Sequence, residues 1–186
     1  LEAVQLPGEL SLEAFYAASL GTAGVSLSPG AAGALETGRS FLSRELQSGT
    51  HIYGVNTGFG PLVGRSVDAD SVLELQENLL QQLSCNVGPL MPAPVSRGTV
   101  ILRAAAIARG RSGASPELLE ALVAMIESGA TPAIRAYGSV GASGDLVPLA
   151  TMARALRGEG ELRLRDGSLH RNDRELLRRL GLEPVT

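Results

Sequence analysis

The sequence predicts a mainly helical fold with only short β elements. Several segments begin with helix-capping residues, and apolar residues recur at helical spacing behind those caps. Alternating apolar and polar residues, which mark half-buried strands, are few. The chain has 186 residues, of which 44% are hydrophobic and 19% charged, as is typical of a globular domain with a core. We therefore expect residues 1–186 to form a single domain.

The first predicted helix spans residues 29–47, because Ser28 can cap it and Pro29 suits its first turn. It is followed by the stretch HIYGVNTGFG, in which β-branched and aromatic residues run into glycines. A second helix is expected to begin after that stretch, at a capping box formed by Ser71 and Glu74, with leucines along one side.

Three further helices are predicted in the second half of the chain. Residues 94–109 are apolar nearly all round, which indicates burial on several sides. A Ser-Pro pair at Ser115 begins the next helix, and Gly129 ends it. Another helix is expected to begin just after Ser143 and to stop near Gly158.

The C-terminal part predicts a hairpin and a short helix. The segment ELRLRDGSLH alternates apolar and polar residues on both sides of Asp166 and Gly167, which is typical of a two-residue hairpin turn. Asn172 or Asp173 can then cap a last helix that runs through Arg179.

Composition argues against several classes of function. The formal net charge is −3 and the arginines are scattered, so we expect neither a nucleic-acid nor a membrane-surface partner. No apolar run approaches the roughly 20 residues of a membrane helix, and no secretory signal is visible, so a cytoplasmic location is expected. Cys85 is expected to be a small buried hydrophobe, and with His51 and His170 it makes no metal motif.

The stretch GSVGASGDLVPLA, residues 138–150, places glycines and small residues ahead of an apolar run. One interpretation is a flexible loop in which Ser143 or Asp145 caps the next helix. A phosphate-binding loop is a second, but the Walker lysine and the G-x-G-x-x-G spacing are absent. In the third, Ala142, Ser143 and Gly144 react with one another.

That reaction would convert the backbone into an electrophile. If the Gly144 nitrogen attacks the Ala142 carbonyl, a five-membered ring closes with loss of water, and loss of the Ser143 hydroxyl as a second water leaves an exocyclic alkene. The closure needs an unhindered nitrogen and a tightly bent backbone, which the glycines permit. The positive end of a helix that begins near Asp145 would stabilise negative charge when a nucleophile adds to the alkene.

These motifs resemble those of the ammonia-lyases and aminomutases that use a methylidene-imidazolone (MIO) prosthetic group, a family that includes histidine, phenylalanine and tyrosine ammonia-lyases. Ala142, Ser143 and Gly144 fall on the ring-forming triad, and YGVNTGFG at residues 53–60 is similar to the other family signature. LQENLL at residues 75–80 occupies the expected place between them. The resemblance covers essentially the whole chain, although family members are much longer.

The resemblance implies the N-terminal domain of the ammonia-lyase fold, with the start of its long helical bundle. Residues 1–186 are then one domain that carries the MIO group and the catalytic loop, as a fragment of a longer chain. Family active sites are assembled from several subunits of a homotetramer, with further residues supplied beyond Thr186. We therefore expect this chain to be inactive alone unless a C-terminal portion complements it. The MIO group then either forms in this chain or stays uncyclised.

By the same resemblance, Tyr53 lies on a mobile loop and removes or returns the proton next to the departing amine. A free phenol has a pKa of about 10, so helix termini or cationic groups would have to lower that pKa. From the residues alone, the alternative is an aromatic side chain packed at the end of a strand. Asn56, Thr57 and Gly58 are expected to shape the loop, and Gly60 to let the substrate approach the backbone.

The resemblance also places Gln82 and Leu83 in the pocket for the substrate side chain; from the pattern alone they are a surface Gln and a core Leu. Gln82 differs from the His, Phe or Ser-His that relatives specific for tyrosine, phenylalanine or histidine carry. An amide buried beside a phenyl ring costs about 1–3 kcal/mol, which disfavours phenylalanine as substrate. Gln76 and Asn78 either support the site or are solvated.

The implied activity is elimination of ammonia from an aromatic or heteroaromatic L-amino acid, giving an arylacrylate. The substrate amine adds to the methylidene carbon and Tyr53 takes a β-proton; attack through the aromatic ring is the alternative route. A 2,3-aminomutase, which returns the amine to the β-carbon, needs the same groups. A noncatalytic scaffold that never cyclises is the rival from another class, and the presence of both Ser143 and Tyr53 argues against it.

Overall fold

The computed structural model describes residues 3–139, 144 and 146–185. Across these residues the chain is mainly helical, and its strands are only two to four residues long. The helices are α1 (Leu12–Leu20), α2 (Ala31–Gln47), α3 (Val72–Gln82), α4 (Ala93–Ile107), α5 (Pro116–Ser128), α6 (Leu146–Leu156) and α7 (Arg174–Arg179), with 3₁₀ turns at Gly60–Leu62 and Ala69–Ser71. The mainly helical fold class is therefore confirmed.

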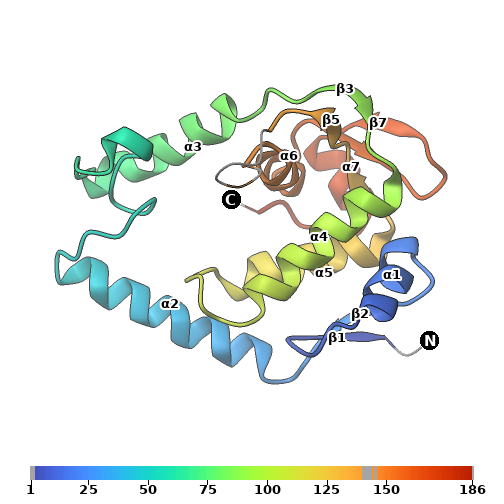
Figure 1. Cartoon of the computed structure of the whole chain (residues 1–186), viewed down its shortest axis with the longest axis horizontal. Coiled ribbons are helices and arrows are strands. Elements are labelled where there is room, and N and C mark those ends of the chain that lie inside the picture. The colour runs from blue at the N-terminus through green and yellow to red at the C-terminus, as the bar shows by residue number, and fades with distance from the viewer. Residues whose placement is uncertain (1–2, 140–143, 145, 186) are drawn as a thin grey trace.

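Helix α4 lies at the centre of the core. It packs against α1 on one side and α5 on the other, as Figure 1 shows. Ile101 of α4 and Leu122 and Met125 of α5 are completely buried. The same core extends through Leu156 of α6 to Leu177 of α7, so one set of buried apolar side chains joins both halves of the chain.

The strands form three small ladders that hold loop ends together. In the first, β1 (Val4–Leu6) pairs in parallel with β2 (Val25–Leu27). In the second, β3 (Val87–Leu90), which follows α3, pairs antiparallel with β5 (Arg135–Tyr137), which precedes the glycine-rich stretch. The third contains β4 (Thr131–Pro132), β6 (Glu161–Arg163) and β7 (Leu169–Arg171) in that order, all antiparallel. The second ladder brings the end of α3 close to the start of the glycine-rich stretch.

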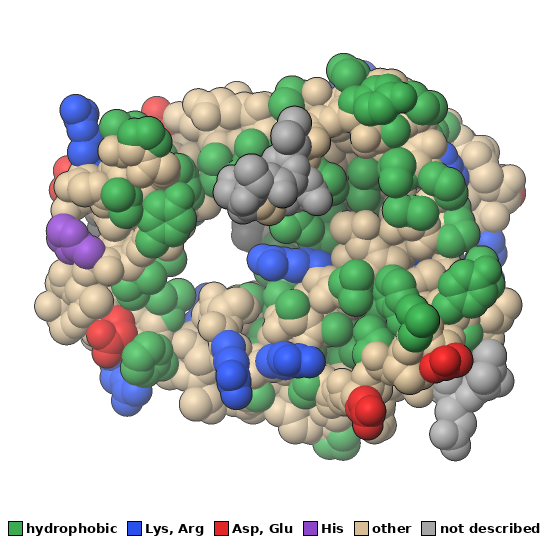
Figure 2. Space-filling model, in the orientation of Figure 1, with side chains coloured by type: hydrophobic (Ala, Val, Ile, Leu, Met, Phe, Trp, Pro, Cys, Tyr) green, Lys and Arg blue, Asp and Glu red, His purple; other side chains and the backbone are tan. Residues whose placement is uncertain are grey.

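Helix α3 is attached to the rest of the molecule by few contacts. None of its described side chains is fully buried, and Leu73 is 78% exposed. Glu77 accepts a hydrogen bond from Arg157, beyond the end of α6, and this bond raises the pKa of the Arg157 guanidinium. Figure 2 shows an opening through the molecule between the surface over α2 and α3 and the central core. The leucine-lined side of α3 is thus only partly covered.

Capping by serine side chains, predicted at the starts of α2 and α3, does not occur, although α3 begins directly after Ser71 as predicted. Helix α2 begins at Ala31, two residues after the predicted start. The Ser28 side chain does not cap it; the Ser28 backbone carbonyl accepts a hydrogen bond from the Ala31 N–H. Ser71 precedes α3 but forms no side-chain capping bond, because its backbone is already wound into a 3₁₀ turn (φ −98°, ψ −7°). The capping box with Glu74 therefore does not form.

The other predicted elements need smaller changes. Ser115 caps α5 and Asp173 caps α7 through their side-chain oxygens, as predicted. The hairpin turn has three residues instead of two, because the Leu164 N–H bonds to the Ser168 carbonyl and Gly167 adopts a left-handed conformation (φ +86°). Sequence reasoning missed α1, although Ser11 caps it by accepting from the Ala14 N–H.

Cys85 is exposed, so the prediction that it is a buried hydrophobe is wrong. It lies just after α3, where that helix has left the core. Of the helices that the structure describes, none combines the length and apolar character that a membrane span requires. The described residues also contain no cluster of three or more His, Cys, Asp or Glu side chains able to hold a metal ion.

A close contact between glycines fixes α2 against the loop that joins α4 to α5. A Cβ atom built on Gly38 would lie 2.1 Å from the Gly110 carbonyl oxygen, far inside van der Waals contact. A Cβ atom on Gly110 would in turn lie 2.4 Å from the Ala34 carbonyl oxygen. Helix α2 can approach the loop this closely only because both residues lack side chains.

We predict that Gly38→Ala lowers the free energy of unfolding by roughly 1–3 kcal/mol, because the new methyl group must push α2 away from the loop. Gly33→Ala, on the same helix, is the matched control: a Cβ there meets no atom within 4 Å. The control should raise stability by about 0.5–1 kcal/mol, since alanine favours helix interiors. Urea denaturation measures both, and equal effects of the two substitutions would refute the close contact.

Candidate functional site

The segment that contains Tyr53 is folded largely by its own hydrogen bonds. Asn56 accepts a bond from the Ile52 N–H (2.7 Å) and donates to the Thr50 carbonyl (2.9 Å). Thr57 is buried; its hydroxyl accepts from the Gly54 N–H (3.3 Å) and donates to the Gly58 carbonyl (3.0 Å). The expectation that Asn56, Thr57 and Gly58 shape this loop therefore has a structural counterpart in these contacts.

Gly58 permits the tightest part of this loop. A Cβ atom at Gly58 would lie 2.6 Å from the carbonyl oxygen of Leu62 and 2.7 Å from its side chain. The Gly58 N–H also bonds to the Arg65 carbonyl at 3.0 Å. A larger residue would therefore separate the two arms of the loop.

Tyr53 and Gly60, both predicted site residues, are brought together. The Tyr53 phenol oxygen accepts a hydrogen bond from the Gly60 N–H at 3.1 Å. The ring of Phe59 meets the Tyr53 ring edge to face, with centroids 6.3 Å apart. The tyrosine is nevertheless 61% exposed, so its phenol stays accessible to a ligand and its own proton is free to be donated. It is held at a loop, away from any strand end.

Tyr53 also lines a cavity of about 920 Å³ between this loop, α2 and the α4–α5 connection. Phe41 and Leu42 of α2 supply apolar surface, whereas Arg109 and Arg111 supply positive charge. An open hollow with these features can accept an aromatic group near Tyr53.

Side chains from three segments meet where the glycine-rich stretch begins. The Ser139 hydroxyl accepts a bond from the Val147 N–H (3.3 Å) in the first turn of α6. Asn86, after α3, donates to the Thr151 hydroxyl of α6 (3.1 Å). A Cβ atom at Gly138 would lie 2.7 Å from Val147 and 3.0 Å from Asn86, so this position has room only for glycine. The first turns of α6 are thereby hydrogen-bonded to Ser139, which follows β5, and to Asn86, which follows α3.

The predicted ring-forming triad is only partly visible. Ala142 and Ser143 lie outside the described residues, and so does Asp145. Gly144 is described: it is exposed, its φ is +105°, and a Cβ atom there would meet nothing within 4 Å. Capping of α6 by Ser139, eight residues before Val147, is a feature that sequence reasoning missed.

The two predicted side-chain pocket residues at the end of α3 differ in their surroundings. Leu83 lines a cavity of about 240 Å³ together with Leu80 and with Leu146, the first residue of α6. The structure thus brings Leu83 to the helix that follows the predicted triad. Gln82 is exposed and does not line this cavity. Arg103 of α4 is the charged residue at its wall, which is otherwise apolar.

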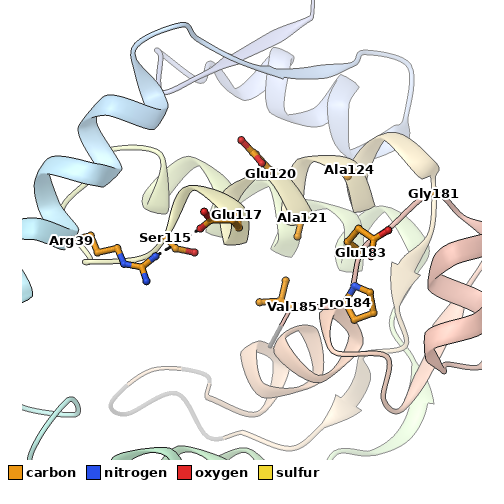
Figure 3. Close-up of a pocket in the computed structure, with 10 residues that line it drawn as sticks. All are labelled: Arg39, Ser115, Glu117, Glu120, Ala121, Ala124, Gly181, Glu183, Pro184 and Val185. Atoms are coloured by element: carbon orange, nitrogen blue, oxygen red, sulfur yellow. Dashed lines mark ion pairs between the residues drawn. The ribbon is translucent and has the colours of Figure 1, made fainter. Parts of the chain in front are cut away.

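Another cavity, of about 640 Å³, lies between α5 and the C-terminal segment (Figure 3). Arg39 of α2 reaches Glu117 at its edge, with 3.8 Å between the charged atoms. Backbone hydrogen bonding at the start of α5, aided by Ser115 and Arg39, lowers the pKa of the Glu117 carboxyl. None of the motif residues lines this cavity, so it is not our candidate site.

Gln76 contacts the Tyr53 loop, whereas Asn78 is exposed. The Gln76 amide, on the half-buried side of α3, donates to the Gly54 carbonyl at 3.1 Å. From the sequence alone, each of these two side chains was expected either to support the site or to be exposed to solvent. Helical spacing cannot choose between them, because the partner is a backbone carbonyl in a loop whose path the spacing does not predict.

Comparison with known proteins places these features in a family. The sequence profile of the aromatic amino acid lyases matches residues 10–186, so the chain belongs to that family. It is 41% identical to a histidine ammonia-lyase of Anaeromyxobacter sp. (strain K), over 100% of this chain and 38% of that protein. It is 37% identical to a tyrosine ammonia-lyase of Cereibacter sphaeroides, over 98% and 35%. The chain therefore spans little more than a third of the length of these relatives.

Solved structures confirm the fold. The phenylalanine aminomutase of Pantoea agglomerans superposes with a TM-score of 0.89 at 28% identity, over 100% of this chain and 35% of that one. A tyrosine aminomutase from Streptomyces globisporus gives a TM-score of 0.88 at 34% identity, over 98% and 34%. The chain thus has the fold of the N-terminal portion of these enzymes, as the sequence motifs predicted.

We predict that Ser139→Ala lowers the free energy of unfolding by about 1 kcal/mol, the usual cost of losing a helix cap. Ser139→Thr keeps the acceptor oxygen and should cost less. Ser40→Ala, at an exposed position of α2, removes a hydroxyl that caps nothing and serves as the control. Chemical denaturation measures all three; a Ser139→Ala effect as small as that of Ser40→Ala would contradict the cap.

Proposed function

We propose that this chain is the loop-bearing and MIO-bearing part of an ammonia-lyase that eliminates ammonia from an aromatic or heteroaromatic L-amino acid. The observation that carries the proposal is the contact between Tyr53 and Gly60. It holds an exposed phenol in a fixed place within the family signature, as a proton-transfer group requires. Membership of the aromatic amino acid lyase family supports the same reaction class.

The residues around the glycine-rich stretch are compatible with an MIO group formed from Ala142, Ser143 and Gly144. Gly144 has the positive φ that only glycine adopts without strain, and a Cβ atom built on it would meet no atom within 4 Å. Gly138 leaves room for Asn86 and Val147 to close around the base of the stretch. When formed, the group supplies an electrophile that makes the substrate's amine a better leaving group.

Tyr53 is proposed to remove the β-proton of the substrate. To accept this proton the Tyr53 hydroxyl must first lose its own, and the Gly60 N–H, which donates to the same oxygen, would stabilise the deprotonated form and orient its free lone pairs. The edge-to-face contact with Phe59 limits rotation of the ring. These contacts position the phenol before a substrate arrives, so less ordering is needed during proton transfer.

For the substrate side chain we propose the region at the end of α3, where Leu83 supplies apolar surface and Gln82 an amide. Leu83 faces a cavity that is also lined by Leu146, the first residue of α6, two residues after Gly144 in the sequence. An amide at Gln82 suits a ring that carries a hydroxyl or a nitrogen better than a plain phenyl ring. The names of the histidine and tyrosine ammonia-lyase relatives agree with that preference.

A 2,3-aminomutase giving a β-amino acid is the second candidate, because structures of two aminomutases superpose on this chain. Both reactions start with the same proton removal, so product analysis separates them. We further propose that catalysis requires a homotetramer and the remaining length that relatives possess. Residues 1–186 alone should then be inactive, since the groups that bind the substrate carboxylate lie elsewhere.

We predict that the intact protein, as expressed from its gene, has a mass lower than its sequence mass by two water molecules. Ser143→Ala should abolish this loss, because it removes the hydroxyl that leaves. Tyr53→Phe should keep the loss and lower the elimination rate by about 100- to 10,000-fold, the usual contribution of a general base.

Intact-mass spectrometry and the ultraviolet absorbance of the arylacrylate product measure these two effects. An unmodified mass in the intact protein would overturn the proposal and favour a noncatalytic scaffold. Full activity in Tyr53→Phe would leave the electrophile in place but remove Tyr53 from the mechanism.

A further inference from the structure

The Tyr53 loop has one hydrogen bond that comes from elsewhere in the molecule. In the described part of the chain, the hydrogen bonds of residues 53–66 stay within residues 50–67, apart from the bond that Gln76 donates to the Gly54 carbonyl. The Val67 N–H, for example, bonds to the Asn56 carbonyl at 2.9 Å. Helix α3 therefore holds the loop through a single side chain.

The bond reaches the loop at the residue next to Tyr53. Gly54 adopts a left-handed conformation (φ +75°), and a Cβ atom there would lie 3.4 Å from the ring of Phe59. Its N–H is bonded to the Thr57 hydroxyl at 3.3 Å. When Gln76 holds the Gly54 carbonyl, both ends of this residue are hydrogen-bonded, and the backbone that carries Tyr53 is fixed with it.

The other attachments of the loop are weaker or less directional. Ile52, Tyr53 and Val55 line one wall of an open cavity whose opposite wall includes α2, and this arrangement does not fix the orientation of the loop. The phenol of Tyr53 is bound by Gly60, which belongs to the same loop and moves with it. At its N-terminal end the loop is tied to α2, because Thr50, which accepts a bond from Asn56, itself bonds to Glu45. Gln76 is the group that hydrogen-bonds residues 53–66 to α3 in the described part of the chain.

We propose that Gln76 is a positioning residue, which holds the Tyr53 loop in the orientation needed for proton transfer. This inference rests on the proposed function, in which Tyr53 is the base. Gln76 acts through the Gly54 carbonyl and touches no reacting atom. The role requires an N–H donor at position 76, because the partner is a carbonyl oxygen.

Two substitutions test the need for a donor. Gln76→Met keeps the length of the side chain but cannot donate. Gln76→Glu keeps the shape and, when ionised, directs a negative charge at the Gly54 carbonyl. Gln81→Met is the matched control, since Gln81 is exposed on the same helix. All are made in the intact protein as expressed from its gene.

The first measurement is hydrogen–deuterium exchange of the amides of residues 53–60. Gln76→Met and Gln76→Glu should raise their exchange rates severalfold, whereas Gln81→Met should not. The second is the elimination rate: kcat should fall roughly 3- to 10-fold in both Gln76 variants, the effect of losing one ordinary hydrogen bond, while KM changes little. The loss of two waters should remain complete, because the hydrogen bond of Gln76 goes to the Tyr53 loop and the proposed role does not involve ring closure.

Each other outcome has a definite meaning. Exchange rates and kcat equal to those of Gln81→Met would overturn the role of Gln76. Faster exchange with unchanged kcat, in an enzyme that Tyr53→Phe inactivates, would also overturn it. The bond from Gln76 would then hold the loop without contributing to proton transfer. Faster exchange in a protein that neither loses water nor eliminates ammonia would support the tether and overturn the proposed function instead.

Discussion

Burial of α4 is the constraint on which the rest of the structure depends. Ile101 and Ala104 are completely buried between α1 and α5, so both neighbours must keep a fixed distance and crossing angle. Arg97, on the same helix, donates to the Ala18 carbonyl of α1 and the Ile126 carbonyl of α5. These carbonyls lie in the last turns of α1 and α5, where each also accepts the N–H of the glycine that ends its helix. Burial, together with the nearby Arg165, lowers the pKa of Arg97, whose charge the two helix ends offset.

This constraint extends from the core to the candidate site through the strands. Strand β3 leads into α4, and β5 follows α5, so the packing of these helices determines how the two strands meet. The strands approach so closely that a Cβ atom on Gly88 would lie 2.4 Å from the ring of Tyr137. Immediately beyond β5, Gly138 meets Asn86 in the same way. The packing of α4 and α5 thus brings β3 and β5 together, and the paired strands bring the end of α3 close to the start of α6.

The sequence predicted the elements that local chemistry specifies. Ser115 was recognised as a cap, and Asp173 as one of two candidates beside Asn172, because each stands directly before the helix whose N–H it binds. Ser28 and Ser71 look alike in sequence, but the chain around them is already turning, and their side chains form no cap. Ser139 caps α6 from eight residues away, a contact that no local rule contains.

The candidate site likewise contains some contacts that the sequence predicts and others that it does not. The motif YGVNTGFG was enough to place Tyr53 and Gly60 in one site, because a short loop keeps them near each other. Which of Gln82 and Leu83 faces α6 depends on how α3 is rotated about its axis, and that rotation is set by contacts with α6 and Arg157. The contact between Gln76 and Gly54 depends on that rotation too.

Apart from the bond from Gln76, the hydrogen bonds of residues 53–66 stay within residues 50–67, so the internal geometry of this segment is set mostly by its own residues. Such a segment can be exchanged as a whole with little change to the core. Two conditions limit the exchange: the ends must meet α2 and the turn before α3, and position 76 must keep an amide. A change in this segment or at the end of α3 therefore alters the candidate site and leaves the buried contacts of α4 in place.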